Sequence, residues 1–225
     1  MQLQDIVPWG RSGAEYARMF ALQPEDLAGR RVLSFGDGPS DFQVWARGQC
    51  TRVQSVDPLY AFEADAIAER IEAVRPEITK GLQESRAAFH WDDFDSPEAM
   101  VENRLATMAR FLDDYRARGN DGQSYLARAL PDLDGVMEAD LGLCSHLLFL
   151  YSAHLDEDTH WTWLQAMLTK VPELRVYPLV RLDGTPSEHV APMTTRLLQA
   201  GFGVEQVPCH YRVQQGAYNF LRITR

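Results

Sequence analysis

The sequence predicts an α/β fold with a mostly parallel sheet of seven strands, an antiparallel last strand and helices on both faces. Short apolar segments alternate with amphipathic helical segments along most of the chain, which is typical of βαβ units. The last two apolar segments have only Gln214, Gln215 and Gly216 between them, so they are expected to pair antiparallel. We expect residues 1–225 to form a single domain.

The expected strands are short apolar runs that end at turn residues. The first ends at Gly36 and the second ends at Asp57, so both lead directly into polar or flexible positions. The seven runs are residues 31–35, 52–56, 124–130, 140–145, 174–179, 204–213 and 217–223.

The expected helices of the core are identified by apolar residues three and four positions apart. The first is expected over residues 14–22, with Ser12 as its N-cap. Another begins near Ser40, with Phe42, Val44 and Trp45 facing inward. Two further helices are expected over residues 159–170 and 187–200.

Residues 60–120 have helical patterning throughout, which is far more than a crossover between parallel strands needs. We interpret this segment as an inserted helical cap over one end of the sheet. Pro76 is expected to end the first helix of the cap, because proline has no backbone N–H to donate. Residues 1–30 are expected to form an N-terminal helical lid.

The charge balance excludes several kinds of partner. With 22 Lys and Arg against 32 Asp and Glu, the net charge is −10. A surface this acidic repels phosphate backbones and anionic lipid, so neither nucleic acid nor a membrane is an expected partner. The expected partner is a small-molecule substrate, and the protein is expected to be a monomer or a homodimer.

The cysteine pattern and the first residues indicate a cytoplasmic protein. Cys50, Cys144 and Cys209 form no CxxC pair, as expected for reduced thiols. The segment MQLQDIVPWGRSG has no apolar core of a signal peptide, and no apolar run is long enough to span a bilayer. No metal site is expected, since the spacing of His154, Asp156, Asp158 and His160 matches no common motif.

The segment VLSFGDGPS is the most informative in the chain. Gly36 and Gly38 follow a strand and precede a helix, so the backbone can approach a ligand closely there. Asp57 ends the next strand 19 residues after Gly38, at the spacing where an acid binds a ribose diol. A dinucleotide is disfavoured, because Asp41 occupies the third glycine position and would face a pyrophosphate. Asp37, Asp41 and Asp57 instead suit a cationic nucleoside such as S-adenosylmethionine.

VLSFGDGPS and VQSVDPLY resemble the glycine motif and the second motif of class I S-adenosylmethionine-dependent methyltransferases, which have a Rossmann-like fold. The reversed last strand also agrees with that family. The chain is more narrowly similar to a bacterial group of uncharacterised methyltransferase-like proteins, through stretches such as IVPWGRSGAEYARMF, MARFLDDY and LCSHLLFLYS. The resemblance extends over nearly the whole chain, including the inserted helices.

The resemblance implies that the cofactor is S-adenosylmethionine and the product S-adenosylhomocysteine. The chain departs from the family's motif at two positions. Ser34 stands where the family has an acid and Ser40 where it has its third glycine, so Asp37 is expected to replace the acid. The cofactor-binding residues that the resemblance implies are Gly36, Asp37 and Gly38 for the methionine and ribose moieties, Asp57 for the ribose hydroxyls, Pro58, Leu59, Leu130 and Pro131 for the adenine, and Ser145 and His146 near the sulfonium.

Four residues are candidates for chemistry or for holding the cofactor's charged end. His146 and Tyr151 follow the fourth strand, where a neutral histidine could take a proton from an acceptor. Arg11 could pair with the methionine carboxylate, with Tyr16 closing over it. The alternatives are that His146 supports the cofactor without reacting, that Tyr151 and Tyr16 are core phenols, and that Arg11 is solvated.

The sequence therefore predicts methyl transfer from S-adenosylmethionine to a small-molecule acceptor through an oxygen, nitrogen or sulfur atom. The alternative is a methyltransferase-like protein that binds the cofactor without catalysis and regulates a partner. A nicotinamide-dependent reductase is disfavoured by Asp41. DNA base methylation is disfavoured because Pro208 and Cys209 lie on the late hairpin and no Asn/Asp-Pro-Pro-aromatic motif follows the fourth strand.

Overall fold

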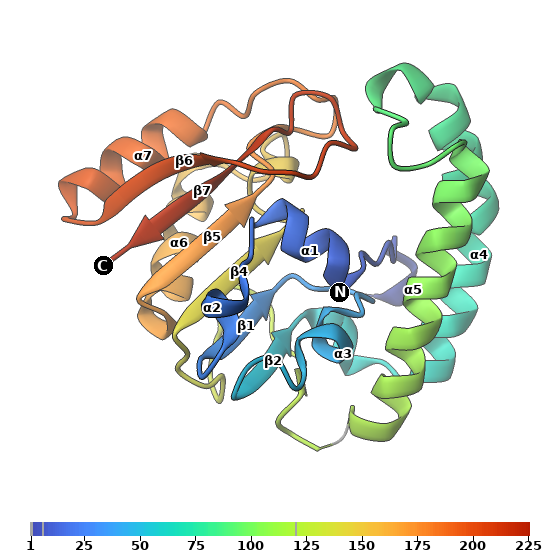
Figure 1. The fold of residues 1–225 in the computed structure, drawn as a ribbon, viewed down its shortest axis with the longest axis horizontal. Helices are drawn as coiled ribbons and strands as arrows, with labels where there is room; N and C mark the ends of the chain where they lie inside the picture. The colour runs from blue at the N-terminus through green and yellow to red at the C-terminus, as the bar shows by residue number, and fades with distance from the viewer. Residues whose placement is uncertain (1, 6, 120) are drawn as a thin grey trace.

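The predicted fold class is confirmed by a computed structural model, which describes residues 2–5, 7–119 and 121–225. One seven-stranded sheet has the order β3-β2-β1-β4-β5-β7-β6 (Figure 1). The pairs among β1 to β5 are parallel, and β7 runs antiparallel to both β5 and β6. The strands are β1 Arg31–Phe35, β2 Arg52–Val56, β3 Tyr125–Leu126, β4 Leu141–Ser145, β5 Glu173–Tyr177, β6 Gly203–Pro208 and β7 Asn219–Thr224.

The strand order reverses between β1 and β4. The chain leaves β1 toward β2 on one side and later returns to β4 on the other, so the loops that follow β1 and β4 diverge. A crevice outside the carboxyl ends of the strands forms at such a point, and ligands of open α/β sheets bind there. Both strands are almost entirely buried, and this fixes the loops that follow them.

Helices cover both faces of the sheet, because successive side chains of a strand point to opposite faces. Val32 of β1 packs with the helices that precede β1 and follow it, whereas Leu33 packs with those near the C-terminus. The first group is α1 Gly13–Met19, α2 Pro24–Leu27 and α3 Phe42–Ala46, and the second is α6 Glu157–Lys170 and α7 Val190–Gln199.

The N-terminal start of α1 confirms the expected cap. The hydroxyl of Ser12 accepts a hydrogen bond from the Glu15 backbone N–H, and the Glu15 carboxylate accepts one from the Ser12 N–H. This reciprocal pair satisfies two N–H groups that a helix start leaves without partners. The helix ends at Met19, three residues earlier than expected, and Ala21 has a left-handed backbone with φ of 47°.

The inserted segment contains two long helices, α4 Ala64–Glu84 and α5 Pro97–Arg118. The expectation that Pro76 ends the first helix is wrong, since α4 continues through it. Pro76 is exposed, whereas Ile71 and Val74 before it and Leu82 after it are buried. Burial of the apolar face beyond the proline outweighs the lost hydrogen bond, which costs about 3 kcal/mol.

Two other expectations about element bounds and one about burial are wrong in part. The third strand is limited to Tyr125–Leu126, because only residues 125 and 126 pair with β2. The terminal hairpin pairs over β6 and β7, and residues 209–218 form a longer connection than expected. In α3, Phe42, Gln43 and Ala46 are buried, whereas Val44 and Trp45 are only half-buried.

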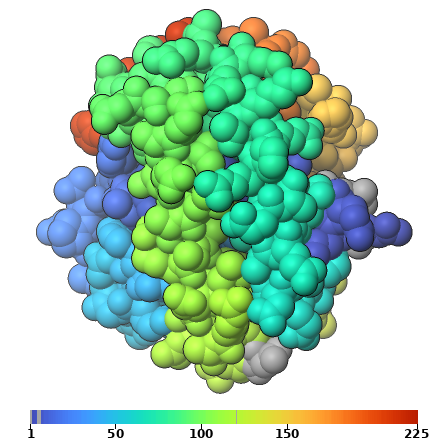
Figure 2. Space-filling view, turned by 90° about the vertical axis from the view of Figure 1, so that its right-hand side faces the viewer, coloured from blue at the N-terminus to red at the C-terminus, as the bar shows by residue number. Residues whose placement is uncertain are grey.

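Helices α4 and α5 lie side by side at the carboxyl ends of the parallel strands (Figures 1 and 2). At one end of this pair, Tyr60, Phe111, Tyr115 and Tyr125 form an aromatic cluster with ring centroids 5.1 to 6.0 Å apart. Tyr60 belongs to the short helix η2 Pro58–Ala61 and Tyr125 to β3, so the cluster joins the helices to the sheet edge.

The other end of the helical pair is attached to the connection between β6 and β7. The backbone N–H of His90 donates to the Val213 carbonyl at 2.8 Å, and the N–H of Gln215 donates to the Ala88 carbonyl at 3.0 Å. Ala88 lies in the short helix η3 Arg86–Ala88. The two helices are therefore anchored at both ends. None of the helices in the described part of the chain is both long and apolar enough to cross a membrane.

The aromatic cluster is expected to stabilise the attachment of α4 and α5 to the sheet. Phe111→Ala removes a fully buried ring and is expected to lower the free energy of unfolding by about 3–5 kcal/mol. Urea denaturation measures this value. Asn103→Ala, at an exposed position of the same helix, is the matched control and should change it by less than about 0.5 kcal/mol. A loss below about 1 kcal/mol for Phe111→Ala would mean that the cluster does not anchor the pair.

Candidate functional site

A cleft of about 560 Å³ lies where the strand order reverses. Its floor is formed by the glycine turn after β1, the start of η2 after β2, and the residues after β4. Residues 7–9 before α1, together with Ile78 and Leu82 of α4, also line it. The cleft therefore brings together the sheet edge, the N-terminal segment and the inserted helices.

The glycine turn requires glycine at both positions, for different reasons. Gly36 has φ of 67°, and a Cβ there would lie 2.6 Å from Leu147 Cδ2. Gly38 has φ of 54°, and a Cβ there would meet nothing within 4 Å, so the space beside Gly38 is open. The Gly38 N–H donates to Asp57 Oδ2 at 2.9 Å, and its carbonyl accepts from the Tyr60 hydroxyl at 2.9 Å. The turn is thus held open beside the cleft.

Asp37 lines the cleft, but its carboxylate already has protein partners. It accepts hydrogen bonds from the hydroxyls of Tyr16 at 2.6 Å, Ser34 at 2.5 Å and Ser55 at 2.5 Å. Burial raises the pKa of Asp37, and these three hydroxyls oppose the rise. Ser34 and Asp37 thus form one hydrogen-bonded unit at the end of β1, where the resemblance implies a single acid.

The expectation that Asp41 serves a cationic ligand is wrong. Its Oδ1 accepts from the Gly13 backbone N–H at 2.6 Å, and its Oδ2 accepts from Arg110 Nε at 2.6 Å. Asp41 is absent from the described lining of the cleft. Its carboxylate instead fixes the start of α1 against α5, because a helix N-terminus attracts a negative charge.

Asp57 faces the cleft at the end of β2 together with Pro58 and Leu59. One oxygen accepts from the Gly38 N–H, and the other accepts from the Leu59 N–H at 2.7 Å. Burial raises the pKa of Asp57 to about 6, despite both hydrogen bonds. The carboxylate is ionised at neutral pH and lies next to the open turn.

Ser145 and His146 form the floor after β4. His146 has a left-handed backbone with φ of 52°, and its N–H donates to the Tyr177 carbonyl at 2.7 Å. Its Nδ1 lies 2.8 Å from Ser145 Oγ. Burial lowers the pKa of His146 well below its usual value, and the charges of Arg11 and Arg104 lower it further. The imidazole is therefore neutral.

The tautomer of His146 depends on the hydroxyl of Ser145. That hydroxyl lies 3.7 Å from Met19 Sδ as well as 2.8 Å from His146 Nδ1, and it has one proton to donate. When the proton points to the sulfur, Nδ1 carries the imidazole proton and Nε2 has a free lone pair. That tautomer can accept a proton at Nε2, whereas the other one can only donate from it.

Arg11 lines the cleft from the segment before α1. Its Nη1 donates to the Trp9 carbonyl at 3.2 Å, and its buried Nε has no hydrogen-bond partner among the described residues. Burial lowers the pKa of Arg11, and the neighbouring charge of Arg104 adds to this. A half-buried guanidinium with one protein hydrogen bond has donors left for an anionic ligand.

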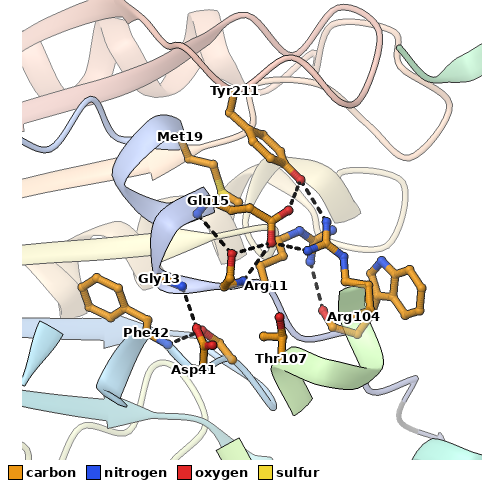
Figure 3. A network of polar contacts seen from close by, with 12 residues as sticks. Arg11, Gly13, Glu15, Met19, Asp41, Phe42, Arg104, Thr107 and Tyr211 are labelled. Atoms are coloured by element: carbon orange, nitrogen blue, oxygen red, sulfur yellow. Dashed lines mark hydrogen bonds and ion pairs between the residues drawn. The ribbon is translucent and has the colours of Figure 1, made fainter. Parts of the chain in front are cut away.

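A buried network behind Arg11 was not predicted (Figure 3). Arg104 of α5 pairs with Glu15 of α1, and the Tyr211 hydroxyl bonds to both, at 2.8 Å from Glu15 Oε1 and 3.0 Å from Arg104 Nη2. The sequence carries two signals for it. Ser12 and Glu15 have the spacing of a capping box, and Arg104 lies on the apolar stripe of α5 between Val101 and Met108.

Two of the predicted site residues lie outside the cleft, and a third lines its exposed edge. Leu130 and Pro131 are absent from the described cleft lining, and Leu130 packs against the core on the side of α6 and α7. Tyr151 lies at the mouth of the cleft and is exposed, so it is not a core phenol. The other candidates all line the cleft, namely Arg11, Tyr16, Gly36, Asp37, Gly38, Asp57, Pro58, Leu59, Ser145 and His146.

Two of the residues whose spacing was considered for metal binding have structural contacts. Asp156 Oδ1 accepts from the Thr159 backbone N–H at 2.8 Å, and His160 Nδ1 lies 2.8 Å from the Asp156 carbonyl oxygen. Across residues 2–5, 7–119 and 121–225, no three His, Cys, Asp or Glu side chains are grouped so that they could hold a metal ion.

Comparison of the sequence with known proteins finds one uncharacterised relative. No protein-family model matches the sequence. An uncharacterised protein of Methanocaldococcus jannaschii is 26% identical over 189 residues, which is 83% of this chain and 84% of the relative.

Solved structures of methyltransferases resemble the fold. Magnesium protoporphyrin IX methyltransferase from Synechocystis PCC 6803, with bound S-adenosylhomocysteine, has a TM-score of 0.51 and 11% identity over 95% of this chain and 83% of its own. The N-methyltransferase NodS from Bradyrhizobium japonicum WM9, also in complex with S-adenosylhomocysteine, has a TM-score of 0.48 and 13% identity over 94% and 83%. The chain has the Rossmann-like fold of class I methyltransferases.

The buried network predicts an acid-sensitive contribution to stability. Burial alone would raise the pKa of Glu15, but the charge and hydrogen bonds of Arg104 lower it to about 2. Stability from a lowered carboxyl pKa is fully present above the unfolded value near 4.5 and is lost as the pH falls toward 2. We expect about 3 kcal/mol of unfolding free energy to be lost over that interval through Glu15.

Urea denaturation between pH 2 and pH 6 measures this contribution as the difference between the wild type and Glu15→Gln. The difference should be largest at pH 6 and shrink as the pH falls through the interval. Glu69→Gln, at an exposed position of α4, is the control and should follow the wild type. A difference between Glu15→Gln and the wild type that stays constant with pH would contradict the role of the ion pair.

Proposed function

We propose that this protein transfers a methyl group from S-adenosylmethionine to a small-molecule acceptor. The observation that carries the proposal is the contact between the open glycine turn and Asp57, with Gly38 N–H donating to Asp57 Oδ2 at 2.9 Å beside the cleft. This contact sets an ionised carboxylate next to a stretch of backbone that a ligand can approach. A ribose diol needs such an acceptor.

The residues of the cleft suit the three parts of this cofactor. The orphaned Nε of Arg11 would bind the methionine carboxylate, which is a charge-assisted contact. Asp57 would accept hydrogen bonds from the ribose hydroxyls. Pro58 and Leu59 would contact the adenine, because they follow Asp57 in the lining. Asp37 would act mainly through the turn, since its oxygens already accept three hydroxyls.

Bound S-adenosylmethionine would supply a methyl group on a positively charged sulfur, and its transfer leaves S-adenosylhomocysteine. The protein would contribute alignment of the acceptor, which can supply much of the rate enhancement. His146 would take the acceptor's proton at Nε2 in the tautomer that leaves this atom free. The lowered pKa of His146 keeps it in the basic form at neutral pH.

Several observations favour a small-molecule acceptor. A cleft of about 560 Å³ is within the usual range for small-molecule sites. Ile78 and Leu82 of α4 form part of its wall, which restricts what can enter. The net charge of −10 disfavours nucleic acid.

Calorimetric titration with S-adenosylmethionine and S-adenosylhomocysteine tests the cofactor. Mass spectrometry of a metabolite panel incubated with cofactor carrying a deuterated methyl group tests the transfer. A labelled product supports an enzyme. Cofactor binding without any labelled product supports the alternative of a non-catalytic binder, and no binding at millimolar concentration contradicts the proposal.

The raised pKa of Asp57 predicts how cofactor binding depends on pH. The ionised carboxylate accepts both ribose hydroxyls, so the affinity for S-adenosylhomocysteine should rise as the pH increases through about 6. Between pH 5 and pH 7 the dissociation constant should fall by about tenfold. Asp57→Asn should bind about 10–100 times more weakly at pH 7 and lose this dependence.

Calorimetry at four pH values between 5 and 8 measures these constants. Asp65→Asn, at an exposed position of α4, is the control and should keep the wild-type profile. An unchanged affinity in Asp57→Asn at pH 7 would refute the position assigned to the ribose.

If His146 is the general base, its replacement should lower kcat without weakening cofactor binding. We expect His146→Asn to lower kcat by about 10²–10⁴-fold, because asparagine cannot act as the base. Asparagine tolerates the left-handed backbone at this position, so the floor of the cleft should keep its shape. The affinity for S-adenosylhomocysteine should therefore stay within about threefold of the wild type.

Steady-state kinetics with the acceptor identified by mass spectrometry, together with calorimetry, measure both quantities. A fall in affinity with an unchanged kcat would show instead that His146 supports the cofactor and takes no part in proton transfer.

A further inference from the structure

The mouth of the cleft is unusually apolar. Val7, Tyr151 and Leu182 are 60%, 39% and 57% exposed, and all three line the cleft. Among the described residues, the only other large apolar side chain that is this exposed is Leu198 of α7. Single exposed apolar residues are ordinary, but these three all line one cleft, which favours an apolar ligand there.

These three side chains come from separate segments of the chain. Val7 precedes α1, Tyr151 ends the short helix η4 Phe149–Tyr151, and Leu182 follows β5. Local sequence therefore does not explain why they meet. Deeper in the cleft, the wall continues with Leu82 of α4 and Leu150 of η4, both of which are buried. Apolar side chains thus line the cleft both where it is exposed and where it is buried.

The charged groups of the cleft lie elsewhere. In the part of the lining that the structure describes, Arg11, Asp37 and Asp57 carry the charges, and His146 is neutral. Asp37 and Asp57 belong to the glycine turn and its contacts, and Arg11 lies close enough to His146 to lower its pKa. Val7, Tyr151 and Leu182 offer no ion with which a charged acceptor could pair. A charged acceptor would gain no ion pair with these three side chains and would lose part of its hydration beside them.

We propose that the methyl acceptor is an uncharged, apolar small molecule with a hydroxyl or thiol group. This inference rests on the proposed function and specifies its substrate class. The apolar body lies against Val7, Tyr151 and Leu182, and the hydroxyl or thiol points toward His146. The oxygen or sulfur forms a bond to the methyl carbon, the electrons of the broken carbon–sulfur bond stay on the cofactor sulfur, and the acceptor's proton goes to His146 Nε2.

Binding to protein saturated with S-adenosylhomocysteine tests the inference by calorimetry. The neutral probes are 2-naphthol and 2-naphthalenethiol, and the charged probes of similar size are naphthalene-2-sulfonate and 2-naphthylmethylammonium. We expect the neutral probes to bind at least about tenfold more tightly than either ion. Leu182→Ser should weaken binding of the neutral probes by about fivefold or more.

Leu198→Ser is the matched control, because it removes an equally exposed leucine away from the cleft. It should leave binding of the probes unchanged. Both variants should keep the wild-type affinity for S-adenosylhomocysteine, which shows that they are folded. Sedimentation of both variants should give the wild-type mass.

Four outcomes would overturn the inference while leaving the proposed function intact. They are binding of neither neutral probe, equal or tighter binding of an ion, an equal effect of the two leucine variants, and a change of mass in Leu182→Ser. The last would mean that the apolar mouth is a contact between two copies of the chain. Failure of S-adenosylhomocysteine itself to bind would instead refute the proposed function, and the inference with it.

Discussion

The ion pair between Glu15 and Arg104 joins three parts of the molecule that are far apart in the sequence. Glu15 belongs to α1, Arg104 to α5, and Tyr211, which bonds to both, to the connection before β7 (Figure 3). Removing one partner of a buried ion pair leaves an uncompensated charge, which is strongly destabilising. The Glu15 carboxylate and the Tyr211 hydroxyl are the partners of Arg104 Nη1 and Nη2, whereas Arg104 Nε has no hydrogen-bond partner among the described residues. The Trp9 ring lies 5.8 Å from the guanidinium carbon. Since Trp9 lines the cleft and Arg11 follows shortly, this pair fixes the N-terminal wall of the site.

The acidic side chains near the glycine turn show why net charge is a poor guide to the ligand. Asp41 pairs with Arg110 and the start of α1, and Asp37 accepts three protein hydroxyls. Asp57 keeps its place beside the open turn, although it too accepts two backbone N–H groups. The acids whose presence in the sequence suggests a cationic ligand are thus hydrogen-bonded to other groups of the protein. A net charge of −10 makes a polyanionic partner unfavourable, but it does not describe the cleft.

The fold was largely predictable because its signals are local. Alternation of apolar strands and helices, the glycine turn, and Ser12 as a cap each depend on a few neighbouring residues. The errors occur where distant contacts dominate. Helix α4 continues through Pro76 because the residues after it, such as Leu82, are buried by other parts of the chain. The third strand is short because only Tyr125 and Leu126 reach β2.

The sheet with its reversed last strand, the glycine turn and the acid that ends β2 could all be predicted from the sequence, because each is a short-range pattern of backbone freedom and apolar spacing. Three other features depend on the folded chain: which acids lie beside the cleft, the burial of Arg104 with Glu15, and the position of Val7, Tyr151 and Leu182 in one cleft. They could not be predicted because burial and pairing are properties of neighbours in space. A residue's charge, pKa and exposure depend on segments that the chain brings together only when it folds.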